Sequence, residues 1–113
     1  MNKHRITKAK DIPVTDRGAY AYSKLIVNDE ATPFNAIKIT VTGTHPTRRI
    51  VHGIRNYYVV EGSGTFVVEK DEYKVEEGTI VTIHPGECYS YNGTMKLFEF
   101  NIPTEGKVEH EDI

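Results

Sequence analysis

Two arginines and one tyrosine have the residue types and spacing best suited to holding a small molecule. Arg55 and Tyr57 alternate with Val59 in one segment of strand type, so the three share a face. Arg49 has the same parity. A guanidinium binds carboxylate or phosphate through two parallel hydrogen bonds, so this face predicts an anion site. In the alternative interpretation, which stays open for Arg49, such arginines reach solvent or form structural ion pairs with glutamates.

Two further tyrosines, Tyr89 and Tyr91, stand two residues apart in a later segment and are candidates for the same cavity as Tyr57. The hydroxyl of Tyr89 can orient a ligand or act as a general acid. A phenol with a pKa of about 10 is a poor base at neutral pH unless a cation such as Arg55 lies beside it. The alternative is that all three tyrosines simply fill the interior.

The histidines give a weaker signal. His4 and His110 lie in the polar ends of the chain and are expected to take no part in a site. His45, His52 and His84 are kept as an alternative metal site, although their spacing does not match that of known zinc ligands.

Composition narrows the class of protein. The chain has 113 residues, of which 38% are hydrophobic and 27% charged, and this predicts one soluble domain. A net charge of -2 leaves no basic excess for nucleic acid. No apolar run approaches the ~18 residues of a membrane span, and no signal peptide is predicted. The single cysteine, Cys88, excludes an internal disulfide and predicts a cytoplasmic protein.

The elements that must position these residues are short strands separated by turns. Segments with period-two alternation or β-branched and aromatic residues recur, and no segment keeps a helical apolar period. This predicts an antiparallel all-β sandwich or barrel. The expected organisation is an N-terminal lead-in over 1–18 that can pair as an edge strand, a barrel over 19–103, and a charged tail over 104–113. The expected strands are Ser23–Val27, Ile37–Val41, Tyr57–Val60, Thr65–Glu69, Tyr73–Val75, Thr79–Ile83, Tyr89–Tyr91 and Lys96–Ile102.

The stretch from Gly43 to Gly93 resembles the two sequence motifs of the cupin superfamily. Gly43 and Gly62 have the spacing of the glycines in the first motif, and Gly78 and Gly86 match those of the second. Glycine permits positive φ at tight corners, so the match is a signal of fold rather than of chemistry. The resemblance implies a double-stranded β-helix, or jelly roll, of the RmlC-like kind.

The resemblance also locates the positions that hold a metal in many cupins. Here they are occupied by Arg49, Val51, Arg55 and Tyr89, with Gly93 at the final position. Arginine stays protonated and has no lone pair to donate, so the usual metal site is expected to be missing. No cofactor is predicted.

Three functions are compatible with such a barrel. The first is a metal-free cupin that binds a small anionic or sugar-like ligand through Arg49, Arg55, Tyr57, Tyr89 and Tyr91, with a sugar isomerase or epimerase activity in which Tyr89 is the acid. The second is a non-catalytic ligand-binding or sensory module. The third is a metal-dependent dioxygenase or isomerase with relocated ligands. The resemblance further implies a homodimer in which the N-terminal segment is exchanged.

Overall fold

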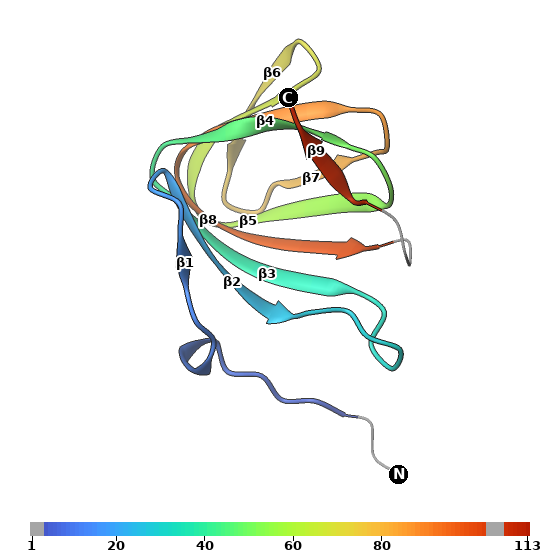
Figure 1. Ribbon diagram of the computed structural model, residues 1–113. Helices are drawn as coiled ribbons and strands as arrows, with labels where there is room; N and C mark the ends of the chain where they lie inside the picture. The colour runs from blue at the N-terminus through green and yellow to red at the C-terminus, as the bar shows by residue number, and fades with distance from the viewer. Residues whose placement is uncertain (1–3, 104–107) are drawn as a thin grey trace.

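The structure, a computed structural model, describes residues 4–103 and 108–113 (Figure 1). These residues form one 3-10 turn and nine strands, so the prediction of an all-β jelly-roll barrel is confirmed. None of the described residues belongs to a helix able to cross a membrane. The elements are η1 (Ala9–Asp11), β1 (Thr15–Asp16), β2 (Tyr20–Ile26), β3 (Asn35–Val41), β4 (Thr44–Ile50), β5 (Ile54–Val68), β6 (Asp71–Glu76), β7 (Ile80–Ile83), β8 (Cys88–Ile102) and β9 (His110–Asp112).

Two long strands, β5 and β8, curl the sheet into a barrel. They pair antiparallel along almost their whole length, and a register shift lies between Val59 and Glu61. Gly62 follows with φ at +85°, and a Cβ there would collide with the backbone of Thr94. The bulge and the glycine let β5 bend without ending. The sequence had predicted two separate strands in β5 and two in β8, and each pair is one bent strand.

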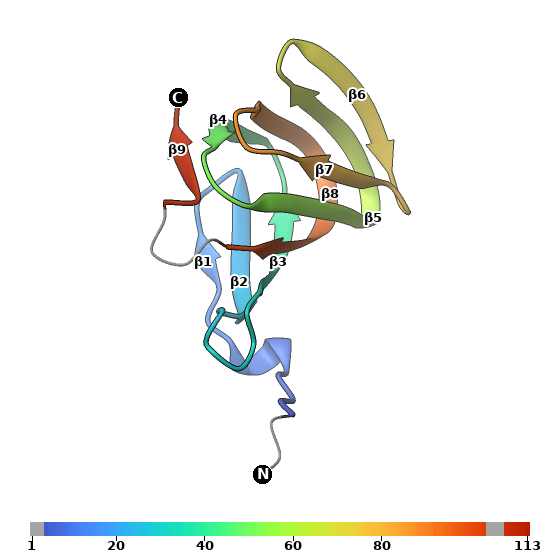
Figure 2. The same cartoon turned by 90° about the vertical axis from the view of Figure 1, so that its right-hand side faces the viewer.

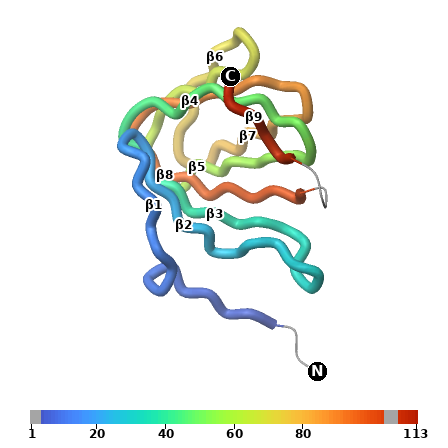
Figure 3. The backbone as a smooth tube through the Cα atoms, in the orientation of Figure 1, coloured from blue at the N-terminus to red at the C-terminus, as the bar shows by residue number. Residues whose placement is uncertain are grey.

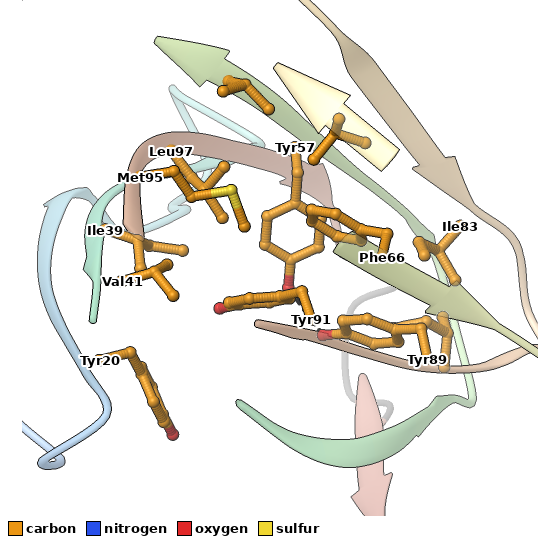
Figure 4. Packing of buried hydrophobic residues seen from close by; sticks show 13 residues of the cluster. Tyr20, Ile39, Val41, Tyr57, Phe66, Ile83, Tyr89, Tyr91, Met95 and Leu97 are labelled. Atoms are coloured by element: carbon orange, nitrogen blue, oxygen red, sulfur yellow. Dashed lines mark hydrogen bonds between the residues drawn. The ribbon is translucent and has the colours of Figure 1, made fainter. Parts of the chain in front are cut away.

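The other strands extend this pair on both sides. One path through the sheet runs β1-β2-β3-β8-β4-β9, and β5 also pairs with β6 and β7 (Figure 2). Side chains that point inward from these strands form the core, which includes four tyrosines (Figure 4). The largest fully buried members are Tyr57, Tyr89, Tyr91, Phe66, Ile50, Ile83 and Leu97.

Two segments expected to be irregular are strands. Residues 44–50, predicted as a loop, form β4 between β8 and β9. Residues 110–112, expected in a charged tail, form β9, which lies beside β4 (Figure 3). At the other end, β1 is a short edge strand on β2 of the same chain. The sheet therefore extends beyond the limits of 19 and 103 that the sequence suggested.

Candidate functional site

A cavity of about 380 Å³ lies within the curl of the sheet. This volume is within the range of small-molecule sites. Its lining is rich in charged, hydroxyl and imidazole groups, and it draws on strands from both ends of the chain. The polar residues among those that line it are Arg17, Tyr20, Tyr22, Lys24, Asn28, Asn35, His45, Arg48, Arg55, Tyr57, Tyr91, Glu99, Asn101, Glu109 and His110.

Arg55 stands at the centre of a buried polar network. Its Nη1 donates to the Tyr89 hydroxyl at 2.9 Å, and its Nη2 donates to His110 Nδ1 at 2.9 Å. Its Nε lies 3.4 Å from a Glu99 oxygen, an ion-pair contact without hydrogen-bond geometry, and Nη2 lies 3.8 Å from Glu109. Burial opposes the charge, but Tyr57, Glu99 and Tyr89 outweigh it and raise the Arg55 pKa. Arg55 is therefore a permanent internal cation.

Glu99 is the anionic partner of Arg55 and is itself buried. Its Oε2 accepts a hydrogen bond from Asn101 Nδ2 at 2.8 Å, and Asn35 donates in turn to Asn101 at 2.9 Å. Burial raises the pKa of Glu99, while Arg55, Asn101 and Tyr57 oppose that rise. The carboxylate is held in place from several sides.

The predicted tyrosines are all buried, and they divide into two roles. The hydroxyls of Tyr57 and Tyr89 lie 2.7 Å apart, and Tyr89 also accepts from Arg55. Tyr57 and Tyr91 line the cavity, whereas Tyr89 reaches it through these two bonds. Burial raises the pKa of Tyr57 and of Tyr91 well above 10, so both remain protonated hydrogen-bond donors at neutral pH.

His45, which the sequence suggested only as a member of the alternative metal site, lines the same cavity. Its ring is stacked on Tyr91 with centroids 4.3 Å apart, and Tyr20 lies 4.6 Å away (Figure 4 shows both tyrosines). Burial, with the nearby charges of Arg48 and Arg55, lowers its pKa to about 4. Its buried Nδ1 has no hydrogen-bond partner among the described residues.

Arg49 requires a correction. It is exposed, donates to Glu111 at 2.6 Å, and does not line the cavity. The pairing of β4 with β8 shifts register between His45 and Arg48, so one extra residue reverses the alternation beyond His45. Arg48 therefore faces inward, and its Nη2 donates to the Tyr20 hydroxyl at 3.3 Å.

The alternative metal site from three histidines does not assemble. His45 lies inside the cavity, His52 Nδ1 contacts the backbone oxygen of Val108 at 2.8 Å, and His84 is an exposed partner of Glu87. Within the described residues, no three His, Cys, Asp or Glu side chains form a group that could hold a metal.

The inward-facing groups that could ligate a metal are instead directed at Arg55. Glu99, Glu109 and His110 all approach its guanidinium. A fixed positive charge in their midst disfavours a second cation at the same place. The residues present therefore do not fit the metal of the wider superfamily.

Sequence reasoning missed His110 and Glu109, which reach the cavity from the segment around β9. One feature of the sequence indicated the pairing of β4 with β9. Arg48 and Arg49 are complementary to Glu111 and Asp112, and in the antiparallel register Arg48 faces Asp112 while Arg49 faces Glu111.

Comparisons with known proteins agree with this architecture. The sequence model of the AraC-like ligand binding domain matches residues 57–106. No curated protein matches the chain. Among solved structures, Pac13 of Streptomyces, a nucleoside dehydratase, has a TM-score of 0.85 at 14% identity, covering 98% of this chain and 92% of Pac13. Pac13 variants with a histidine changed to glutamine or a tyrosine to phenylalanine are known with uridine.

Two structures with lower TM-scores have the same fold. KdgF from Halomonas sp. has a TM-score of 0.76 at 10% identity, covering 89% of this chain and 96% of KdgF. A variant of salicylate 1,2-dioxygenase from Pseudoaminobacter salicylatoxidans has a TM-score of 0.70 at 21% identity, covering 82% of this chain and 29% of the dioxygenase. Together with the barrel described above, these matches show that the chain has the fold of a small cupin.

Proposed function

We propose that this cupin binds a small sugar-like ligand, specifically a nucleoside, inside its barrel. The observation that carries the proposal is the buried imidazole of His45 in the cavity wall, next to the rings of Tyr20 and Tyr91. Among the residues that line the cavity, Tyr20 and Tyr91 add flat apolar faces that suit a sugar or base ring.

The remaining polar groups suit a ligand with several hydroxyls. The Tyr91 hydroxyl is a donor, the oxygens of Glu99 and Asn101 are acceptors, and the neutral imidazole of His45 supplies one of each. Pac13 supports the choice of a nucleoside, because its fold covers almost the whole of this chain and it was studied with uridine.

The same groups favour proton-transfer chemistry. His45 is the candidate base, and the protonated Tyr91 beside it is the candidate acid. Isomerisation, epimerisation and dehydration of a sugar all need such a pair. With a pKa of about 4, His45 is a weak base in the free protein, so activity requires that ligand binding raise this pKa.

Calorimetry with uridine and ribose tests the binding proposal. We expect binding to the native chain and at least a tenfold loss in His45→Gln, because a buried hydrogen-bond partner of the ligand changes. His84→Gln is the matched control, since His84 is exposed and outside the cavity. Equal affinity for all three proteins would contradict the proposal.

The second candidate is a ligand-binding module without catalysis, which the match to the AraC-like ligand binding domain favours. Incubation with a bound nucleoside in D2O separates the two. Exchange of a sugar C–H for deuterium that depends on His45 indicates proton transfer, whereas tight binding without exchange indicates the module. Stoichiometric metal in protein purified without a nickel column would instead support a metal-dependent enzyme.

The homodimer also remains a proposal. Apolar side chains are exposed on the outer face of the sheet, where Tyr58 of β5 pairs with Ile80 of β7. A partner that covered this face would bury them. Light scattering should give twice the mass of one chain, and Ile80→Glu should give a monomer if this face is the interface.

A further inference from the structure

The cavity has more positive than negative charge. Arg17, Lys24, Arg48 and Arg55 line it, against the carboxylates of Glu99 and Glu109. The whole chain has a net charge of -2, so this excess is local. Excess charge of one sign along a cavity attracts ligands of the opposite sign.

The cations differ in how far they are neutralised. Arg55 has both lining carboxylates as neighbours, and Arg48 Nε bonds to Asp112 at 3.1 Å. For Arg17 and Lys24, the described part of the chain contains no carboxylate in ion-pair contact.

The partner that Arg17 and Lys24 share is Tyr22 on β2, between them in sequence. Lys24 Nζ lies 6.0 Å from the centre of the Tyr22 ring. The Arg17 guanidinium lowers the Tyr22 pKa. A neutral phenol leaves the charge of both cations uncompensated.

The positive charges in the cavity also affect the pKa values of its two histidines, His45 and His110. The pKa values of His45 and His110 are both lowered to about 4, first by burial and then by Arg48 and Arg55. An anion bound near these cations would offset their effect and raise both histidine pKa values.

The cations and the sugar-binding groups occupy different depths. Arg17 and Lys24 are exposed and Arg48 is half-buried, whereas His45 and Glu99 are buried. An anionic group in the cavity therefore meets the arginines and the lysine near solvent, while the rest of the ligand extends inward.

We propose that the ligand is a phosphorylated sugar, such as a nucleoside 5'-monophosphate. Its phosphate is held by Arg17, Lys24 and Arg48 at the solvent-facing end of the cavity, which we call the mouth. This inference rests on the proposed function for the inner part of the ligand. It also moves the anion site away from Arg55, whose guanidinium already contacts Glu99, Glu109, Tyr89 and His110. Three cations with forked or mobile donors suit the three terminal oxygens of a phosphate monoester.

Pairs of ligands that differ only in a phosphate group test the phosphate site at the mouth separately from the sugar site in the interior. Calorimetry compares uridine 5'-monophosphate with uridine, and ribose 5-phosphate with ribose, with inorganic phosphate as a further probe. Each phosphorylated ligand should bind at least about tenfold more tightly than its neutral counterpart, and the difference should shrink as salt is added.

The variant Arg17→Gln/Lys24→Gln should remove most of this difference, because it weakens binding of the phosphorylated ligands more than binding of their neutral counterparts. Arg5→Gln/Lys38→Gln is the matched control, because it removes the same two charges outside the cavity. In an NMR titration, the bound phosphate ligand should raise the pKa of His45 and His110. Uridine should raise these two pKa values less than the phosphate ligand does.

The outcomes separate the two proposals. Equal affinity for uridine and its monophosphate overturns the phosphate site and leaves the nucleoside proposal standing. In a further outcome, ribose 5-phosphate or inorganic phosphate binds to the native chain but not to the double variant, and neither uridine compound binds. That result supports the phosphate site and overturns the nucleoside proposal. Failure of every probe to bind overturns both.

Discussion

The change Arg55→Met should strongly destabilise the barrel. Methionine keeps an apolar stem but removes the charge next to Glu99, a carboxylate only 6% exposed. Removing one partner of a buried ion pair typically destabilises by about 3–5 kcal/mol, because the other charge is left without compensation. For a domain of this size, that is a fall in Tm of more than about 10 °C.

The effect should depend on pH in a defined direction. Without Arg55, burial raises the Glu99 pKa further above its ordinary value of 4.5. An acid whose pKa is higher in the folded state binds its proton more tightly there, so stability falls as pH rises above the unfolded pKa. The deficit of Arg55→Met relative to the native chain should therefore be smaller at about pH 4.5 than at pH 7.5.

Urea unfolding followed by circular dichroism at both pH values measures these free energies. The double variant Arg55→Met/Glu99→Leu should recover much of the loss, because it removes both charges. A single variant that loses less than about 1 kcal/mol at pH 7.5 would refute the reasoning, as would a double variant no more stable than the single.

Three further changes test other parts of the site. The native chain should lose stability between pH 6.5 and pH 4, because the pKa of His45 is lower in the folded state than in the unfolded state. In His45→Phe this loss should be smaller by up to about 3 kcal/mol, as measured by urea titrations at the two pH values. Tyr57→Phe should lower the unfolding free energy by about 1 kcal/mol, because it removes the hydrogen bond to Tyr89. Tyr73→Phe, at an exposed position, should hardly change the unfolding free energy, and a larger loss there than in Tyr57→Phe would contradict the prediction. Arg49→Gln should leave ligand affinity unchanged and lower stability by less than about 1 kcal/mol, so a loss of binding would return Arg49 to the site.

Much of the fold could be predicted because its determinants are local. Alternating strands and glycines at tight corners are visible in the sequence, and Gly62 has the positive φ that its motif position predicts. Gly43 is different, since its φ is not positive. A Cβ there would lie 2.9 Å from Ala19 Cβ, so close approach requires the glycine. The spacing of the motif located both glycines without distinguishing their causes.

The site was predicted less well because its geometry depends on pairing between distant segments. Arg55 and Tyr57 were placed correctly by alternation within one strand. Arg49 was placed on the wrong face because the bulge in β4 is set by the register with β8. Pro46, which has no N–H to donate, is the one local sign of that irregularity. His110 depends on β9 joining β4 across 60 residues of sequence.

Arg55 explains how the barrel accommodates inward carboxylate and imidazole groups. In the free protein, Glu99 and Glu109 need a cation nearby, and the guanidinium supplies one that is covalently fixed. The charge of Arg55 is balanced by these carboxylates, and two of its donors are bonded to Tyr89 and His110. In our proposal, the anionic group of a ligand is therefore held by Arg17, Lys24 and Arg48 instead of Arg55. The arginine that most resembles a binding residue in the sequence therefore has a structural role as the partner of two carboxylates in the cavity wall.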